Sequence, residues 1–290
     1  MGQTVTRAID SHQHFWSLAR GDYGWLTPAL APLYRDFLPA DLAPLLRSAE
    51  IDRTILVQAA PTVAETRFLL DLAQRTDFIA GVIGWVDMAA EDAADVIAEL
   101  TTDPRLRGIR PMIQDIADID WMLAPGLTPA FRSLAERDLC FDALVRPQHL
   151  RNLGILLGRH PDLKVVIDHG AKPRIADGQF DEWAADMARL ARETPALCKI
   201  SGLVTEAPSG ATLESLRPYL DHLFTVFGPE RLMWGSDWPV VNLACQYSTW
   251  WETMQRYLTP LDPAARGAVL GRTAARFYGI EGLVVERLDD

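Results

Sequence analysis

The sequence has few cysteines and none in the spacing of a redox or metal-binding pair. Its three cysteines, Cys140, Cys198 and Cys245, lie far apart in a chain of 290 residues. Disulfide-stabilised folds use an even number of cysteines, and redox or zinc motifs place two of them close together. The sequence therefore excludes a disulfide scaffold and predicts reduced, partly buried thiols in a cytoplasmic protein.

Long apolar segments and basic clusters are also missing. No stretch approaches the roughly 20 apolar residues of a membrane-spanning helix, and the first residues lack the apolar core of a signal peptide. The 28 Lys and Arg residues are outnumbered by 39 Asp and Glu residues, which gives a formal net charge of −11. Because such a chain repels phosphate backbones and anionic lipids, we expect neither nucleic acid nor a membrane as its partner.

Three motifs of common enzyme classes are absent. The first expected strand is not followed by a GxGxxG turn or a P-loop, the usual phosphate-binding signals of open α/β sheets. Ser11, Ser201 and Ser236 follow or end apolar runs, but none lies in a GxSxG elbow. A serine triad is therefore not expected, and no sequence feature calls for an organic cofactor.

What the chain does contain is a repeated alternation of apolar runs and amphipathic segments. The expected strands are residues 7–12, 53–58, 79–86, 108–112, 140–145, 164–168, 197–201 and 231–235. Expected helix N-caps lie between them at Thr62, Thr128, Thr212 and Asp262. Such alternation predicts a parallel sheet, and eight units match a TIM-type barrel. We therefore expect an α/β fold, a single (β/α)8 barrel in one domain over residues 1–290.

The first expected strand ends in two histidines, at the edge of a barrel where catalytic groups gather. His12 and His14 are two residues apart, so in a strand they point to the same face. Two imidazoles on one side form half of a zinc site. They can equally donate hydrogen bonds to a substrate or be ordinary capping histidines.

The sixth and eighth expected strands end in His169 and Asp237, which we expect to be catalytic. A carboxylate beside histidines in a half-dry site can take a proton from water, although Asp237 could instead cap the next helix. His169 could be a core histidine, and in a regular strand it would point away from Asp168. His149, four residues after the fifth strand, has no assigned role.

Further polar and aromatic residues near the strand ends are candidates for substrate binding. The expected set is Arg110, Lys199, Gln58, Trp238 and Trp85. A guanidinium at Arg110 suits a substrate carboxylate or a polarised carbonyl, but it could also form a salt bridge that fixes the barrel mouth. Lys199 could face outward, and the tryptophans could either wall a pocket or pack in the core.

Five sequence blocks, taken together and in order, resemble the lactonase branch of the amidohydrolase superfamily. They are DSHQHFW, LRGIRPMIQD, VIDHGAKP, CKISGL and RLMWGSDWPV. This branch includes hydrolases of L-fucono- and L-rhamnono-type sugar lactones, of sulfomuconolactone and of pyrone dicarboxylate. The resemblance implies a (β/α)8 barrel that hydrolyses a cyclic ester. It puts His12, His14, His169 and Asp237 on the family's catalytic positions.

Metal use varies within this branch, and the resemblance implies at most one divalent ion. Some members hold a zinc ion at the two paired histidines, here His12 and His14, with Asp237 and His169 available as further ligands. Residues 141–145 offer neither the lysine nor the histidine of the larger binuclear members. Pro111 stands where the sugar-lactone members often have a histidine.

The function expected from these features is hydrolysis of a sugar aldonolactone of the L-fucono or L-rhamnono type by Asp-assisted attack of water. A sulfomuconolactone or pyrone-dicarboxylate lactonase is one alternative, and a metal-dependent decarboxylase of the same superfamily is another. A non-enzymatic binding protein is the alternative hypothesis outside the enzymes, because barrels host many functions. A homodimer is expected only because twofold dimers are common.

Overall fold

The computed structural model describes residues 8–283, and within them eight parallel strands form a closed sheet. The strands are β1 (Ala8–Gln13), β2 (Ile51–Val57), β3 (Ile79–Gly84), β4 (Leu106–Ile109), β5 (Cys140–Ala143), β6 (Lys164–Ile167), β7 (Leu197–Ile200) and β8 (Leu232–Trp234). Their spatial order follows the sequence, and the ring closes where Gln13 pairs with Trp238. The predicted (β/α)8 barrel is confirmed, with each expected strand present and its ends shifted. Residue 7, the expected start of the first strand, lies outside the described residues.

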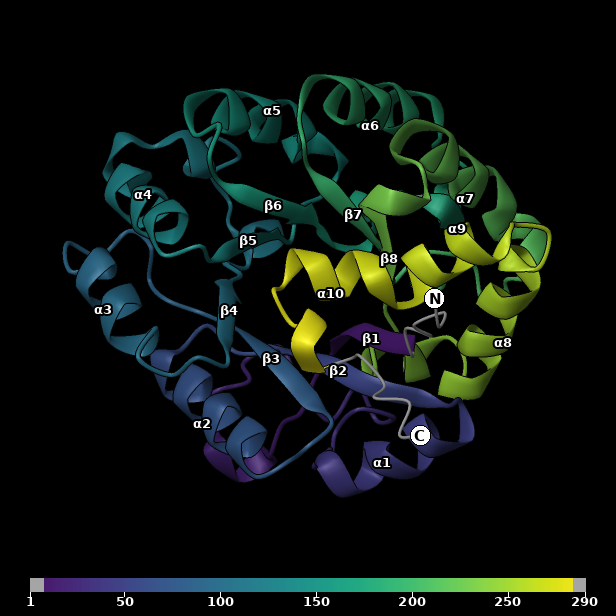
Figure 1. The fold of residues 1–290 in the computed structure, drawn as a ribbon, viewed down its shortest axis with the longest axis horizontal. Helices are drawn as coiled ribbons and strands as arrows, with labels where there is room; N and C mark the ends of the chain where they lie inside the picture. Colours follow the sequence, from purple (N-terminus) through teal and green to yellow (C-terminus); the bar gives the residue numbers. More distant parts are fainter. Residues whose placement is uncertain (1–7, 284–290) are drawn as a thin grey trace.

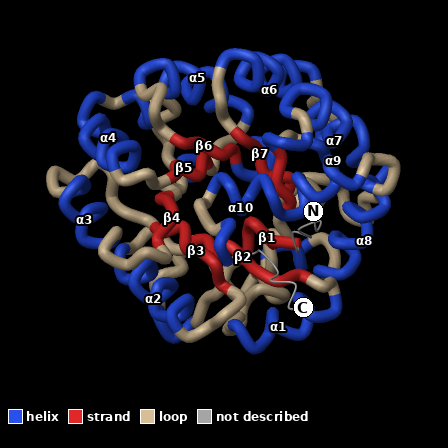
Figure 2. Tube along the Cα trace, viewed as in Figure 1, coloured by secondary structure: helices blue, strands red, loops and turns tan. Residues whose placement is uncertain are grey.

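Helices surround the ring of strands on its outer side, except for the last one, which lies across the centre of the ring (Figures 1 and 2). They are α1 (Pro39–Ser48), α2 (Val63–Gln74), α3 (Ala93–Leu100), α4 (Thr128–Glu136), α5 (Leu150–Arg159), α6 (Asp181–Glu193), α7 (Leu213–Phe227), α8 (Tyr247–Leu258), α9 (Pro263–Gly267) and α10 (Thr273–Phe277). Each of the longer helices buries one apolar stripe against the strands, as α7 does with Leu216, Leu220 and Leu223. Among residues 8–283, no helix has the length and apolar character needed to cross a bilayer.

The predicted helix starts are largely confirmed. The hydroxyl of Thr62 accepts a hydrogen bond from the Glu65 amide, and the carboxylate of Asp262 accepts one from Ala265. Thr212 directly precedes α7. The prediction for Thr128 was wrong, because a short 3-10 turn runs straight into α4 and places Thr128 inside the helix.

The barrel is filled by a small apolar core of its own, separate from the larger core between strands and helices. Inward-facing side chains such as Ile9, Ile55 and Met233 form this inner core. The segment at α10 supplies Ala274 and Tyr278 to the same cluster, and Figure 1 shows α10 lying across the centre of the ring. One end of the barrel is therefore covered, and the other end holds the chemistry.

Polar groups continue this inner core toward the open end. The Tyr278 hydroxyl donates to Asp142 over 3.2 Å, and the Lys199 ammonium lies 2.5 Å from the same carboxyl group. All three side chains are buried.

The three cysteines are free thiols. Cys140 and Cys198 are buried, while Cys245 is half-buried. The predicted unpaired cysteines are thus confirmed.

Removing the Tyr278 hydroxyl tests the buried contact with Asp142. We expect Tyr278→Phe to lower the free energy of unfolding by about 1–3 kcal/mol, because a buried carboxyl group loses a donor. Urea denaturation followed by circular dichroism measures the loss. Tyr257→Phe is the matched control, since its hydroxyl bonds to the solvent-exposed Asp221 over 2.8 Å. Equal losses in the two variants would contradict a special role for the Asp142 contact.

Candidate active site

The paired histidines of β1 reach the barrel interior through an irregularity in the strand. Pairing with β2 shifts register between Asp10 and Gln13. Ile9 faces the inner core, whereas Asp10 accepts a hydrogen bond from Tyr247 on α8, outside the barrel. Because the irregularity inserts a residue at this point, His12 also faces inward, three residues after Ile9. His14 points the same way, as the sequence spacing predicts.

His169 lies in a left-handed turn rather than in a regular strand. Strand β6 ends at Ile167, and His169, Gly170, Ala171 and Lys172 all have positive φ, from 50° to 62°. Such a conformation costs roughly 1–2 kcal/mol for each residue other than glycine. The turn brings the His169 imidazole to the wall of the catalytic cavity, whereas the buried Asp168 carboxylate contacts His12 and Lys199. The regular-strand expectation, in which the two point apart, therefore does not apply.

Two neighbouring groups hold the His169 ring. The Ser201 hydroxyl lies 2.9 Å from its Nδ1. Gly202, with a φ of 64°, runs so close to the ring that a Cβ atom there would lie 2.6 Å from Nδ1. A left-handed glycine is thus needed both for its backbone and for the space that it leaves.

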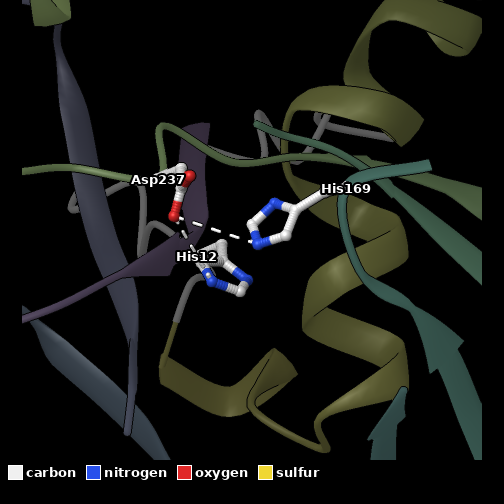
Figure 3. A group of neighbouring side chains, drawn as sticks. All are labelled: His12, His169 and Asp237. Atoms are coloured by element: carbon white, nitrogen blue, oxygen red, sulfur yellow. Dashed lines mark ion pairs between the residues drawn. The ribbon is translucent and has the colours of Figure 1, made fainter. Parts of the chain in front are cut away.

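Asp237 points into the group of histidines at the end of β8. Its φ is 59°, and its amide donates to the His12 carbonyl over 2.8 Å. Oδ1 of its carboxylate lies 3.2 Å from Nε2 of His14, 3.7 Å from that of His12 and 3.9 Å from that of His169. Figure 3 shows Asp237 with two of these imidazoles. The carboxylate therefore faces the histidines and does not act as a helix N-cap.

Burial sets the ionisation states of this cluster. Loss of hydration lowers the pKa of His12 well below its usual range, and Asp168 only partly opposes this. Burial likewise lowers the pKa of His169 to about 4, against the pull of Asp237. Burial alone would raise the pKa of Asp237, but the imidazoles, His169 foremost, lower it below its usual range. The site thus combines an ionised carboxylate with neutral imidazoles at His12 and His169.

This donor set fits a divalent metal ion. His12, His169 and Asp237 each offer a ligand atom, and these atoms all lie within 4.8 Å of one another. Nδ1 of His14 lies 2.8 Å from the Val57 carbonyl oxygen, which can only accept a hydrogen bond. In its neutral form His14 therefore turns an Nε2 lone pair toward Asp237. Lone pairs from imidazole and carboxylate that converge in this way are the ligands of zinc.

Arg110 lines the cavity at the end of β4, and hydrogen bonds to buried groups fix its guanidinium. Its Nη2 donates to both the backbone and the side-chain oxygens of Gln58, the latter over 2.8 Å. Its Nη1 lies 3.4 Å from Asp168 and 3.4 Å from Nε2 of His12. Gln58 is fully buried and so positions Arg110 rather than lining the cavity. The salt bridge predicted as one role of Arg110 is present, with Asp168 as its partner, while binding of substrate by Arg110 stays a prediction.

Lys199 lies beneath the cavity, in the barrel interior, and not on the outward face. Its ammonium contacts Asp142 over 2.5 Å, Asp168 over 3.1 Å and Nδ1 of His12 over 3.2 Å. Burial would lower the pKa of Lys199, but the two carboxylates raise it. With no exposed surface, Lys199 fixes His12 from below and does not reach a ligand in the cavity.

A cavity of about 280 Å³ opens above this cluster. Its lining includes His14, Arg110, His169 and Asp237 together with Trp25, Gln114, Asp115 and Lys172. Trp238, predicted as a possible pocket wall, is 2% exposed and packs against Phe15 and Phe37 in the outer core. Trp85 lines a neighbouring cavity instead.

Several residues of the site were not predicted from the sequence. Asp142 was missed although it lies two residues after the inward-facing Cys140, a spacing that places both on one face of β5. Lys172 and Ser201 were missed because a left-handed turn and a loop bring them to the site. His149 has a structural place, since its Nδ1 accepts a hydrogen bond from the Arg146 amide at the start of α5.

Known proteins are similar in sequence to this protein over nearly the whole chain. A protein of Burkholderia ambifaria named L-fucono-1,5-lactonase is 46% identical over 284 residues, covering 96% of this chain and 97% of its own. Another protein of that name, from Burkholderia multivorans, is 38% identical over 288 residues, covering 94% and 96%.

A solved structure is also similar at this level. A crystal structure of an amidohydrolase from Burkholderia multivorans with bound zinc superposes with a TM-score of 0.89 at 37% identity, covering 94% of this chain and 99% of that one. The profile of the family described as Amidohydrolase matches residues 9–280, which hold every residue of the cluster around Asp237. The chain therefore belongs to the amidohydrolase family.

Proposed function

We propose that this protein is a lactonase that opens a sugar aldonolactone of the L-fucono or L-rhamnono type. The observation that carries the proposal is the ionised Asp237 carboxylate among three imidazoles at the floor of a small cavity. The names of the two relatives, at 46% and 38% identity, support a sugar lactone as substrate. The cavity of about 280 Å³ suits a single ring.

Asp237 is the general base in this proposal. Its carboxylate accepts a proton from a water molecule, whose oxygen attacks the lactone carbonyl carbon. The bond between that carbon and the ring oxygen then breaks. The departing ring oxygen takes the proton from Asp237, and the product is an open-chain hydroxy acid. The carboxylate ends the cycle ionised, as it began.

Arg110 stabilises the negative charge that develops on the carbonyl oxygen, and His169 does the same in the metal-free site, where its Nε2 is not bound to an ion. Both line the cavity beside Asp237, and both are held by buried partners, Gln58 and Ser201. Because their positions are fixed before the reaction, little reorganisation is needed, and one well-aimed donor of this kind contributes about 3 kcal/mol. Lys172 and Gln114 are placed at the wall, where the hydroxyl groups of a sugar ring would lie.

We propose that His12, His169 and Asp237 hold one zinc ion, with His14 beside them. When bound, such an ion lowers the pKa of water to about 7 and polarises a carbonyl group. The zinc in the related Burkholderia multivorans structure supports this choice of metal.

From the reduced cysteines and the general frequency of twofold dimers, we also propose a cytoplasmic homodimer.

The base assignment is tested by Asp237→Asn. An amide cannot accept the proton, so we expect kcat on an aldonolactone to fall by at least three orders of magnitude while the fold is retained. A pH-indicator assay measures turnover, and circular dichroism checks the fold. Asp162→Asn, at an exposed position in the loop before β6, is the control and should behave like the wild type. Near-normal turnover in Asp237→Asn would refute this role.

The metal proposal has its own test. We expect elemental analysis of the purified protein to find about one zinc per chain, and His12→Ala and His169→Ala to lower this content. His222→Gln is the control, since His222 is bonded to the Ala184 carbonyl oxygen on the outside of the barrel over 2.8 Å. Activity is then measured after chelation and after return of zinc. Full activity in metal-free protein would make these histidines hydrogen-bonding groups only.

A further inference from the structure

A second cavity, of about 530 Å³, adjoins the catalytic cavity at the open end of the barrel. The two share Trp25, Met112 and Asp115 in their walls, so they lie side by side with these side chains between them. The histidines and Asp237 line only the first cavity. The single-ring reaction proposed above therefore leaves the larger space without a role.

Three indole rings form much of the apolar wall of the second cavity. Trp25, Trp85 and Trp121 come from the segments after β1, β3 and β4, and each is half-buried. The Trp25 ring is held by a hydrogen bond from Nε1 to the Ala59 carbonyl oxygen over 2.7 Å. The Trp85 backbone is held on both sides by the Thr66 hydroxyl, over 2.8 Å each. The Trp25 ring and the Trp85 backbone are thus held in place before any ligand arrives.

The charged residues that line the second cavity are all acidic, and one of them, Asp22, is paired with Arg20 over 2.6 Å. Asp22, Asp87 and Asp115 line it, and no lysine, arginine or histidine is found among the described residues of its wall. Oδ1 of Asp22 is buried without a hydrogen-bond partner in the described part of the chain. Carboxylates repel an anion and accept hydrogen bonds from hydroxyl groups. The lining therefore disfavours an anion and offers hydrogen-bond acceptors to a ligand rich in hydroxyl groups.

We propose that the second cavity is a subsite for a second sugar ring. A pyranose presents an apolar C–H face, which packs on an indole, and a rim of hydroxyl groups, which donate to carboxylates. This inference rests on the proposed lactonase function and extends its substrate class. The substrates then include aldonolactones that carry a glycosyl group, with the lactone ring beside Asp237 and the second ring among the indoles.

The test compares one lactone with and without a second sugar. The probes are the aldono-1,5-lactone that the wild type hydrolyses fastest and its derivatives with a hexopyranosyl group on each ring hydroxyl. We expect at least one derivative to have a kcat/KM about tenfold higher than the parent lactone, mainly through a lower KM. In Trp121→Ala this advantage should disappear while the parent lactone is hydrolysed as before, and Trp121→Phe should keep most of it.

A second variant tests the subsite by filling the cavity, so its result does not depend on removing a side chain from the wall. Gly24 lines the second cavity but not the first, its φ is not left-handed, and a Cβ atom there would meet no heavy atom within 4 Å. Gly24→Phe should therefore fold and abolish the preference for the glycosylated lactone. Gly126→Phe is the matched control, because Gly126 is equally open and lines neither cavity. It should leave the preference unchanged.

The outcomes separate this inference from the proposed function. If neither class of lactone is hydrolysed, the lactonase proposal itself fails. If the parent lactone is hydrolysed but no glycosylated derivative is preferred, or the preference survives in both Trp121→Ala and Gly24→Phe, the subsite is refuted and the lactonase function stands. A greater preference for an alkyl or aryl group of similar size would also overturn it, since the cavity would then be an apolar pocket.

Discussion

The position of His12 depends on a row of charges buried inside the barrel. Its Nδ1 lies 3.4 Å from Asp168, whose charge is balanced by Lys199 at 3.1 Å, and Lys199 in turn contacts Asp142. Charges without access to water are tolerated only when they are paired. Removing Lys199 would leave two carboxylates without a counter-charge beneath the histidine, so the row fixes the place of the ring, while burial keeps the ring neutral. Tyr278 anchors its lower end, which links the C-terminal part of the chain to the site.

The backbone around the site is strained at the residues that carry the chemistry. His169 and Asp237 both adopt left-handed conformations that side chains other than glycine rarely take. Close packing of glycine backbone against the histidines accompanies this strain. A Cβ atom at Gly235 would lie 2.7 Å from the His12 Cβ, just as one at Gly202 would strike His169. The barrel therefore holds these side chains with a rigidity that a flexible loop would not supply.

The sequence allowed the strands and the central residues of the site to be predicted, because both follow from local pattern. Apolar runs marked the strands, and His12, His14, His169 and Asp237 were recognised because they end such runs. The orientation of Lys199 and the inward position of Asp142 could not be read, since each depends on which face of a short, fully buried strand meets the barrel interior. The register irregularity before Gln13 and the left-handed turn at His169 depend on contacts with distant segments. Trp238 was misjudged for a related reason: whether an indole at a strand end packs inward or outward depends on its neighbours.

Chemistry and recognition are divided between two kinds of structure in this protein. The groups around Asp237 stand at the ends of strands, where hydrogen bonding within the sheet limits their movement. The indoles of the second cavity stand on the segments that follow β1, β3 and β4, and such loops can change in length and composition without disturbing the strands. Because Trp25 lines both cavities, a ligand that packs on it in the second cavity also limits where a linked ring lies in the first. Binding energy from the remote part of a substrate would then help to place the lactone carbonyl against Asp237.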